Sequence, residues 1–590
     1  MNHGPPADPS VSALAILLRG GDLPGHAGNY GRLVANKGLF GALRRHGGYD
    51  SIHWLTDRGE RTADAVLAQL QHVLGRGSCR DRLSSPLSTQ AAVQAGTLLH
   101  GSAYLGASAW LRRHNNQERQ YSLVGTFFGI AVAEVREQML GSLLTPLHPW
   151  DALICSSPTV QSAVRTMLEN MGAYLAERTG ARTLPLPQLP VIPIGVDAPA
   201  LAARRADAEA RRSLRDQLRI GDDAIAVLWV GRLSWFDKAF PQPMLLALEQ
   251  AAAASNMPVH FVMAGYFRDE TTNRPRFEEA AQVYAPHVRL HLLDGNDPQL
   301  VEQCWAAADI FLSLSDTILE TFGQAPVEAM AAGLPVVLSD WNGYRSLLRH
   351  GEEGLLIPTL AAPAGGNGHW LALSQAMGLA DQRVYGGSVA QGVAVHVGQA
   401  AAALTALISS AELRHRLGEA GRRRALHSFD WPVVVAAHQA LFENLAERRR
   451  HGHNAALPIT ARSLALPPLG NDPFEDFGSY ASQQLSDELL VRCSADPRLP
   501  ATAVLPRCEL DRLLPGLRGS DHELVQLVAQ LQANGCCSVA SLLAPFPRKR
   551  WPFLRMSLVW MAKLGHLDWL EPGDQASMVQ ASASVTKGTK

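Results

Sequence analysis

The stretch SLSDTILETFGQAPVEAMAAGLPVVLSDWNGYRSLL, residues 313–348, decides the fold of this chain. It opens at the end of an apolar strand and runs through a loop that carries Asp316 and Glu320. After a tight glycine turn we expect a helix to start near Ala325 or Pro326, because proline is tolerated in the first turn of a helix. A Gly-Leu-Pro sequence then ends the helix before a second apolar strand. Strand, glycine turn, helix and strand in this order are typical of a parallel α/β sheet.

The turn between the first strand and the helix has the features of a ligand site. We expect the backbone N–H groups of Gly323, Gln324 and Ala325 to point out of the helix N-terminus, which favours anions and polar oxygens. Two carboxylates flank the turn, Glu320 before it and Glu328 after it. Carboxylates accept hydrogen bonds from hydroxyl groups, as on a sugar or a ribose. The segment therefore predicts a site for a polyhydroxylated, phosphate-bearing ligand.

Short apolar runs alternate with helical patterns on both sides of this segment, as far as about residue 450. Unalternating apolar strands between helices indicate a parallel sheet that is covered on both faces. A proline-rich hinge over 184–193 separates two such series, so the predicted fold class is α/β with two doubly wound, Rossmann-like domains and a cleft between them. We expect a first domain over 1–195 and a second over 196–430, followed by a helix over 431–450 that returns to the first domain. After it we expect a linker over 451–483, a small helical or winged-helix-like domain over 484–572, and a disordered tail over 573–590.

Composition and charge argue against several classes of protein, among them disulfide-rich, zinc-binding and membrane-spanning proteins. The chain has 590 residues and a formal net charge of -1, so no whole-chain field attracts nucleic acid or anionic membrane. Its seven cysteines are scattered and form no CxxC pair, which argues against a disulfide framework and a zinc site. The N-terminus does not resemble a signal peptide, and no apolar run approaches the ~20 residues of a membrane span. We expect a cytoplasmic protein, either soluble or peripheral at the inner membrane face.

Several motifs together resemble the retaining family-4 glycosyltransferases of the GT-B fold. The E-x7-E pair lies within E-T-F-G-x-x-x-x-E-A-M-A-x-G-x-P-V-V, which starts at Glu320. D-W-N-G-Y-R over 340–345, E-G-L-L-I-P over 353–358, and V-G-R-L over 230–233 followed by Lys238 also match. The resemblance covers about residues 12–448 and is strongest over 225–360. It implies that the first domain faces the acceptor and that the second binds a nucleoside-diphosphate sugar.

Residue roles follow from the same resemblance. Glu328 would hold the ribose hydroxyls of the nucleotide, and Glu320 would contact hydroxyls of the transferred sugar. The donor would also be bound by Gly323, Gln324 and Ala325 through their backbone, and by Gly231, Gly265 and Asp316. Asp316 is equally explained as a loop or helix cap.

The resemblance also implies that Arg232 and Lys238 neutralise the departing diphosphate. Two fixed cations stabilise the charge that builds on this leaving group, so the site would need no metal ion and no cofactor. The predicted reaction moves a sugar from a nucleoside diphosphate to a hydroxyl acceptor of unknown identity. Retention of anomeric configuration is implied by the family resemblance alone.

The N-terminal half departs more from this family. Its glycine-rich turn carries Gly21, His26 and Gly28, and a turn of this kind approaches the diphosphate and the acceptor in the family. For His26 an exposed loop position is the preferred interpretation, and a contact with the acceptor is the alternative. Many relatives have a histidine where this chain has Phe128, so a His-mediated sugar contact is in doubt. His100, at the end of another strand, is an alternative, and a packed strand-end residue is the simpler interpretation.

The C-terminal region does not belong to the usual fold. Its helical patterns loosely resemble a winged helix, and basic residues cluster at 548–550 and Arg555. Acidic residues accompany this cluster, so we do not expect nucleic acid as the partner. A protein-interaction or acceptor-docking module is the preferred interpretation. Its aromatic residues Trp551, Phe553, Trp560 and Trp569 are explained either as its core or as an apolar patch for a partner or a membrane surface.

Two other functions remain open from the sequence. One is a phosphorylase or a nucleotide-sugar epimerase on the same fold. The other is a non-catalytic regulator that senses a sugar nucleotide and acts through the C-terminal module. The presence of Arg232, Glu320 and Glu328 together argues against lost catalysis.

Overall fold

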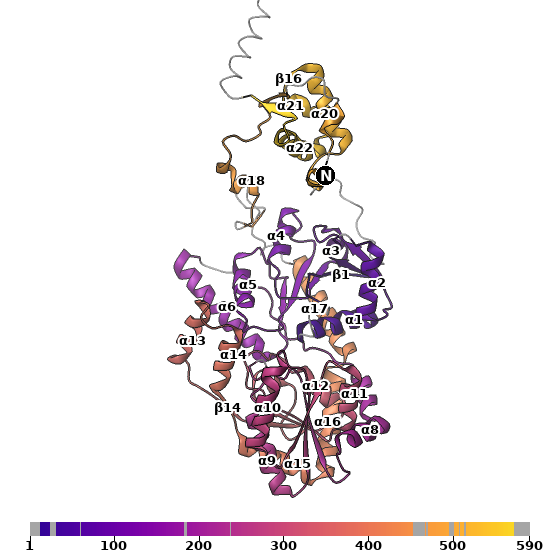
Figure 1. Cartoon of the computed structure of the whole chain (residues 1–590), viewed down its shortest axis with the longest axis vertical. Coiled ribbons are helices and arrows are strands. Elements are labelled where there is room, and N and C mark those ends of the chain that lie inside the picture. The colour runs from indigo at the N-terminus through magenta and orange to yellow at the C-terminus, as the bar shows by residue number, and fades with distance from the viewer. Residues whose placement is uncertain are drawn as a thin grey trace, which may run out of the picture. The chain divides into compact units, whose positions relative to one another are not determined.

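The computed structural model describes residues 12–23, 31–59, 61–181, 186–236, 238–451, 466–467, 470–494, 501–506, 508–512 and 515–570. The chain divides into two compact units, residues 1–468 and residues 469–590. Figure 1 shows the elements of both units. Residues 452–465, 468 and 469 of the expected linker, and the whole of the expected tail over 573–590, lie outside the described residues.

The first unit begins with a six-stranded parallel sheet of order β3-β2-β1-β4-β5-β6. Its strands are β1 (Ala13–Leu17), β2 (Ser51–Leu55), β3 (Arg80–Ser84), β4 (Thr97–His100), β5 (Ser122–Thr126) and β6 (Ala152–Ile154). Its helices are α1 (Gly31–His46), α2 (Ala63–Leu74), α3 (Gln90–Ala95), α4 (Gly106–His114), α5 (Ala133–Gly141) and α6 (Pro158–Thr179). Alternate residues of β1 enter different cores: Leu14 and Ile16 pack on one face, and Ala15 and Leu17 pack on the other. The sheet is thus buried on both faces, as its apolar strands predict.

A second parallel sheet of order β12-β11-β10-β7-β8-β9 repeats the arrangement. Its strands are β7 (Ile225–Val230), β8 (Val259–Gly265), β9 (Arg289–Asp294), β10 (Ile310–Ser313), β11 (Val336–Ser339) and β12 (Leu355–Ile357). Its helices are α7 (Ala198–Arg205), α8 (Ala208–Leu218), α9 (Gln242–Ser255), α10 (Glu270–Tyr284), α11 (Pro298–Ala307), α12 (Gln324–Ala331), α15 (Val397–Ser409) and α16 (Ala411–Ser428). Each sheet has the strand order of a Rossmann-like domain, which confirms the predicted fold class.

The chain crosses between the two halves at two places that contact each other. The N–H of Val196 donates to the carbonyl of Phe429 over 2.8 Å, and the N–H of Trp431 donates to the carbonyl of Val196 over 3.1 Å. Beyond this crossing, α17 (Trp431–His451) packs on α1 of the first half. The Trp431 ring packs directly against Gly38 and Gly195. A Cβ atom on these residues would lie only 2.4 Å and 2.3 Å from the ring, so neither position has room for a side chain.

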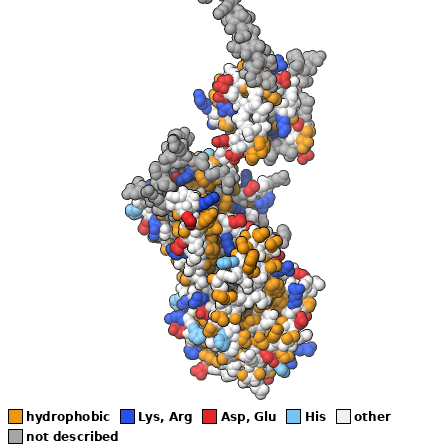
Figure 2. All heavy atoms as spheres, turned by 90° about the vertical axis from the view of Figure 1, so that its left-hand side faces the viewer, with side chains coloured by type: hydrophobic (Ala, Val, Ile, Leu, Met, Phe, Trp, Pro, Cys, Tyr) orange, Lys and Arg blue, Asp and Glu red, His pale blue; other side chains and the backbone are white. Residues whose placement is uncertain are grey.

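An excursion leaves the second sheet after β12. The antiparallel pair β13 (Thr359–Ala361) and β14 (Val393–Val395) closes its base, with Thr359 opposite Val395. Between these strands lie α13 (Asn367–Ala376) and α14 (Gln382–Gln391). No residue of α13 is buried, and Trp370 and Met377 are 70% and 71% exposed. Figure 2 views the side of the molecule that carries this excursion, where hydrophobic side chains gather.

The second unit has its own small core. A three-stranded antiparallel sheet of order β16-β15-β17 is formed by β15 (Leu490–Cys493), β16 (Cys536–Ser538) and β17 (Leu567–Trp569). It packs with α20 (Asp521–Asn534), α21 (Val539–Leu543) and α22 (Trp551–Lys563), and the short helices α18 (Pro473–Asp476) and α19 (Glu509–Arg512) precede them. Across the described residues of the chain, no helix has the length and apolar character needed to cross a membrane.

Candidate functional site

A cavity of about 220 Å³ lies between the two halves of the first unit, at the N-terminus of α12. We call it the donor cavity. The first half contributes Gly31, Arg32 and Phe128. Of the residues singled out in the sequence, the cavity is lined by Arg232, Lys238, Glu320, Gly323, Gln324 and Ala325. The residues named here come from four segments, 31–32, 128, 232–238 and 320–325, and the fold brings them to one place.

Two loops of the second half hold each other beside this cavity. The hydroxyl of Ser315 donates to the carbonyl of Lys238 over 3.0 Å. The hydroxyl of Thr317 donates to the carbonyl of Phe236 over 3.1 Å. These bonds fix the loop after β7 against the loop after β10. The position of the Lys238 backbone is therefore set by contacts with the second loop.

Lys238 and Glu320 form an ion pair across the two loops. The Lys238 Nζ atom donates to Glu320 Oε2 over 2.7 Å. Burial raises the pKa of Glu320, but the Lys238 charge and the backbone N–H groups of Phe322 and Thr321 outweigh it and hold the pKa below its usual value. Glu320 is therefore an ionised acceptor at neutral pH, next to a cation.

The turn before α12 requires glycine. Gly323 has φ of 107°, in the region that side chains rarely adopt. A Cβ atom there would lie 2.5 Å from Cε1 of Tyr344, whose ring packs beneath the turn. The Tyr344 hydroxyl is itself fixed by a 3.0 Å hydrogen bond with Ser313. Gly323, Gln324 and Ala325, at the start of α12, line the donor cavity above this ring.

Glu328 lies one helical turn further along α12 and is half-buried. The side-chain amide of Gln324, which lines the cavity, donates to Glu328 Oε1 over 3.1 Å. Burial raises the pKa of Glu328 to about 7, and the Gln324 bond opposes this shift. Glu328 itself is not part of the cavity lining, and it is joined to the cavity through Gln324.

Asp316 is buried at the base of the loop, with only 2% of its surface exposed. Its Oδ2 atom accepts from the N–H of Phe240 over 3.4 Å, whereas Oδ1 has no hydrogen-bond partner among the described residues. Burial raises its pKa to about 7. The structure thus places Asp316 behind the Lys238 loop, outside the lining of the donor cavity.

Gly231 and Gly265 lie where β7 and β8 end. A Cβ atom on Gly265 would come within 1.9 Å of the Gly231 carbonyl oxygen, and one on Gly295 would come within 2.6 Å of the Gly265 Cα atom. The N–H of Gly295 donates to the Gly265 carbonyl over 2.9 Å. Close packing of the three strand ends explains Gly265 and Gly295. Neither Gly231 nor Gly265 lines the donor cavity.

Thr321 joins the two halves, and its role could not be read from the sequence. Its carbonyl accepts from the hydroxyls of Ser156 over 3.3 Å and Ser157 over 3.0 Å. Its own hydroxyl donates to the carbonyl of Phe128 over 3.1 Å. The residue that follows Glu320 is thus anchored to the first half. Ser157 also caps α6, accepting from the N–H of Val160 over 3.3 Å.

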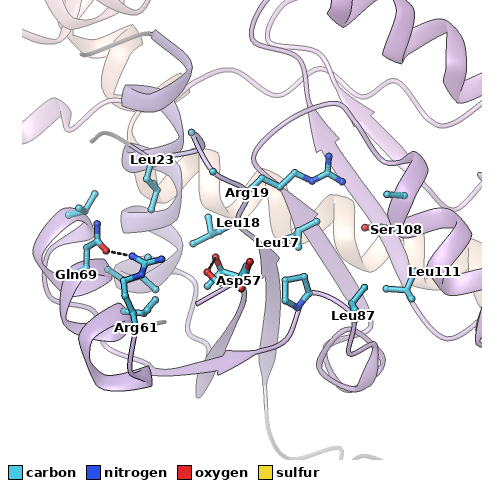
Figure 3. Close-up of a pocket in the computed structure, with 18 residues that line it drawn as sticks. Leu17, Leu18, Arg19, Leu23, Asp57, Arg61, Gln69, Leu87, Ser108 and Leu111 are labelled. Atoms are coloured by element: carbon cyan, nitrogen blue, oxygen red, sulfur yellow. Dashed lines mark hydrogen bonds between the residues drawn. The ribbon is translucent and has the colours of Figure 1, made fainter. Parts of the chain in front are cut away.

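A larger cavity of about 680 Å³ lies within the first half, beside the glycine-rich turn. Gly21 lines it, together with Arg19 and Asp57. Figure 3 shows Leu17, Leu18 and Leu23 around the acidic side chain of Asp57. His26 and Gly28 lie outside the described residues.

The first half also contains a buried acid beside this turn. Asp22 accepts from the N–H of Arg19 over 2.8 Å and from the Arg32 side chain over 3.2 Å. Arg32 also donates to the Gly21 carbonyl over 2.8 Å, which links the turn to a residue of the donor cavity.

His100 is buried at the end of β4, with 2% of its surface exposed. Burial and the nearby charge of Arg19 lower its pKa to about 3. It lines neither the donor cavity nor the larger cavity of the first half. The packed strand-end position is what the structure shows for this histidine.

Among the described residues, no group of three or more His, Cys, Asp or Glu side chains is placed to hold a metal ion. The positive charge at the donor cavity comes from side chains, with Arg232 and Lys238 in its lining.

Comparison with known proteins places this site in a family context. Residues 210–363 match the sequence model of the family described as "Glycosyl transferases group 1". The phosphatidyl-myo-inositol mannosyltransferase of Mycobacterium leprae is 34% identical over 127 residues, 22% of this chain and 24% of that protein. The D-inositol 3-phosphate glycosyltransferase of Geodermatophilus obscurus is 24% identical over 274 residues, 46% of this chain and 50% of that protein. The chain thus spans between a quarter and a half of the length of these curated relatives.

Among solved structures, Anabaena HepE in complex with UDP aligns with a TM-score of 0.45 and 16% identity, over 74% of this chain and 100% of that one. The family match over 210–363 includes the loop of Glu320 and the start of α12. It confirms the resemblance to group 1 glycosyltransferases for the second half of the first unit. The narrower assignment to retaining family-4 enzymes stays a prediction.

Proposed function

We propose that this protein is a glycosyltransferase that moves a sugar from a nucleoside diphosphate to a hydroxyl acceptor, with retention of configuration. One observation carries the proposal: the Lys238–Glu320 ion pair of 2.7 Å lies in a cavity at the N-terminus of α12. The cavity therefore offers a cation for phosphate, an ionised acceptor for sugar hydroxyls, and backbone N–H groups for either. The family match over 210–363 supports the same activity.

The donor is held by groups of different chemistry. Glu328 accepts hydrogen bonds from the ribose hydroxyls, and Glu320 accepts them from the transferred sugar. The N–H groups of Gly323, Gln324 and Ala325 contact sugar and phosphate oxygens. When the donor binds, the Lys238 ammonium turns toward the negatively charged diphosphate, and its hydrogen bond to Glu320 weakens. The ammonium has three N–H donors, so it can bond to both groups.

Charge on the leaving group is the main chemical demand of the reaction. Breaking the anomeric C–O bond leaves its electron pair on the nucleoside diphosphate. Arg232 and Lys238 lie in the cavity lining and stabilise this charge, Arg with two parallel hydrogen bonds and Lys as a point charge. Fixed cations of this kind act without reorganisation during the reaction, so the proposed mechanism uses no metal ion.

Retention is proposed through attack on the same face of the sugar. The acceptor hydroxyl forms the new C–O bond on the face that the diphosphate leaves, and its proton passes to the departing phosphate oxygen. No enzyme nucleophile is needed in this route. Anchoring of Thr321 to the first half by Ser156, Ser157 and the Phe128 carbonyl keeps the two halves together around the reacting groups.

Slow hydrolysis of the donor in the absence of acceptor tests this function directly. UDP-, GDP- and ADP-sugars are incubated with the protein, and release of the nucleoside diphosphate is measured. We expect release from one of the three donors, and a loss of at least about tenfold in Glu320→Gln. Glu352→Gln, at an exposed acid of the same half, serves as the matched control and retains the wild-type rate. Equal release by wild type and Glu320→Gln would argue against the proposed function.

A further inference from the structure

A second cavity, of about 650 Å³, meets the donor cavity at Glu320 and Thr321, which line both. We call it the side cavity. The first half contributes residues around α5 and α6, and the second half contributes the 340–345 motif, β13 and α14. The 680 Å³ cavity of the first half, in contrast, shares no lining residue with the donor cavity. Glu320 and Thr321 thus stand at the boundary of the two cavities, next to the proposed sugar site.

The motif D-W-N-G-Y-R is divided between the two cavities. Tyr344 lies beneath the glycine turn of the donor cavity, and a Cβ atom on Gly343 would meet the Thr321 carbonyl oxygen at 2.4 Å. Trp341 and Arg345, on the other hand, line the side cavity. The Trp341 indole N–H donates to the carbonyl of Thr317 over 2.9 Å, which fixes the ring as part of the wall. One short motif thus supports Glu320 and shapes the side cavity.

The side cavity has one basic side chain, Arg136, that forms no ion pair among the described residues. Arg345 is paired with Asp340 over 3.1 Å, and Glu320 is paired with Lys238 over 2.7 Å. Arg136 of α5 has only uncharged hydrogen-bond partners among the described residues: its Nε donates to the Ile130 carbonyl over 3.2 Å, and its Nη2 donates to the Tyr385 hydroxyl over 3.1 Å. A guanidinium has five N–H donors, so Arg136 retains donors and a positive charge for an anion.

The rest of the wall is largely apolar. It is formed by Ile130, Val160, Met167, Ile318, Trp341 and Val389. A wide apolar wall with few polar groups is the usual composition of a site for a small organic molecule. The flat face of a tryptophan also suits a ring-shaped body. The cavity thus combines a largely apolar wall, one cation without an acidic partner among the described residues, and Glu320 in its lining.

We propose that the side cavity is the acceptor site, and that the acceptor is an anionic molecule with an apolar or ring-shaped body. Its phosphate or carboxylate pairs with Arg136, its body lies against Trp341, and its hydroxyl points to the transferred sugar beside Glu320. This inference rests on the proposed function and names its acceptor class. The excursion between β13 and β14 supplies Tyr385 and Val389, so it forms one wall of the site.

Two small probes carry the proposed features. Phenyl phosphate and benzoate each join a ring to an anion, and benzyl alcohol serves as the neutral control. Binding is measured by calorimetry with UDP, or whichever nucleotide binds, held at saturation so that the donor cavity is occupied. We expect phenyl phosphate or benzoate to bind, and Arg136→Gln to weaken that binding about tenfold or more, because a charge-assisted hydrogen bond is lost. Arg136→Lys retains part of the affinity because the charge stays.

Two matched pairs of variants control for other effects. Arg178→Gln removes a charge from an exposed position of α6 and leaves binding unchanged. Ala163→Trp fills the side cavity and abolishes probe binding, whereas Ser162→Trp, at the exposed neighbouring position, does not. Nucleotide affinity is measured on each variant and stays within about twofold of wild type.

The outcomes separate the two proposals. Anionic-probe binding that depends on Arg136 and is blocked at Ala163 supports the acceptor site. Absent anionic-probe binding, or binding equal in wild type, Arg136→Gln and Ala163→Trp, overturns it. Release of nucleoside diphosphate that depends on Glu320 is a separate result and decides the proposed function by itself. Benzyl alcohol that binds as tightly as the anionic probes also overturns it, because Arg136 then plays no part.

Discussion

Lys238 donates a 2.7 Å hydrogen bond to Glu320, although the two residues are 82 positions apart in the chain. Both belong to loops at the carboxyl ends of neighbouring strands, β7 and β10, and the order of the second sheet brings those loops together. Hydrogen bonds from Ser315 and Thr317 to the backbone of the Lys238 loop then fix the pair. The pairing holds a cation and an ionised carboxylate together at one cavity.

Removing the cation tests its role in stabilising the leaving group. We expect Lys238→Ala to lower the transfer or donor-hydrolysis rate by about 10²–10³-fold, the range seen when one preorganised charge-stabilising group is lost. Lys37→Ala, at an exposed position of α1, is the control and keeps the wild-type rate. A Lys238→Ala protein with wild-type kcat and nucleotide affinity would exclude this role for the lysine.

Glu328 predicts a pH dependence of nucleotide binding. Its pKa is raised to about 7 by burial, so the carboxyl is largely protonated below that pH and ionised above it. Ribose hydroxyls donate better to the ionised form, so affinity rises with pH up to about 7, by at most about tenfold per pH unit, and then levels off. Titration of the Kd of UDP, or of whichever nucleotide binds, between pH 5 and pH 9 measures this. In Glu328→Gln we expect the rise in affinity to disappear, apart from the part that ionisation of the nucleotide phosphate causes. A pH profile of affinity equal to that of wild type would contradict the role of Glu328 at the ribose.

Asp316 predicts a pH dependence of stability. Its pKa in the folded protein is raised to about 7 from 3.8, so the folded state favours the protonated carboxyl. The stability that this preference contributes is fully present below about pH 3.8 and is lost as the pH rises through about 7, at about 1.4 kcal/mol per pH unit. Asp316→Asn never ionises, so we expect it to gain stability relative to wild type on going from pH 5 to pH 8. Thermal unfolding midpoints at both pH values measure the difference, and a difference that does not change with pH would show that Asp316 is not the titrating group.

The glycine turn before α12 offers a test of backbone geometry. Gly323→Ala forces a Cβ atom to within 2.5 Å of the Tyr344 ring, at φ of 107°. Gly351 has φ of 81° and nothing within 4 Å, so Gly351→Ala carries the backbone cost without the clash. We expect Gly351→Ala to cost about 1 kcal/mol and Gly323→Ala to cost about 1–3 kcal/mol more, with loss of nucleotide binding only in the latter. Equal unfolding midpoints and equal binding in the two variants would show that the turn tolerates a side chain.

Much of the fold is predictable because its strands are apolar and its helices have clear ends. The strand and helix around Glu320 lie close to where the sequence predicts them, with α12 starting at Gln324 instead of Ala325 or Pro326. The strands β2 and β3 give a weaker signal. Ser51 and His53 interrupt the apolar run of β2, and β3 is an edge strand with charged, partly exposed residues. Edge strands need not be apolar, so hydrophobicity alone does not identify them.

Other parts of the site have no local sequence signal. The bond from Ser157 to the Thr321 carbonyl joins residues 164 positions apart, and it depends on how the two halves pack. The burial of Asp316 depends in the same way on the Lys238 loop that covers it. The sequence resemblance assigns Gly231 and Gly265 to donor binding. In the structure, close packing against the Gly231 carbonyl accounts for the glycine at position 265 without a ligand.

The central claim is that the cleft at α12 binds a nucleotide donor, and nucleotide-dependent thermal stability tests it most directly. Unfolding midpoints are recorded with UDP, GDP, ADP and their sugar conjugates for wild type, Glu328→Ala and the control Glu279→Ala, at an exposed position of α10. A ligand at 100 times its Kd adds about 2.7 kcal/mol to the free energy of unfolding, which raises the midpoint. We predict that one nucleotide raises the midpoint of wild type and Glu279→Ala, and that the shift shrinks in Glu328→Ala. No shift with any nucleotide, or an equal shift in all three proteins, would contradict a nucleotide donor bound at Glu328.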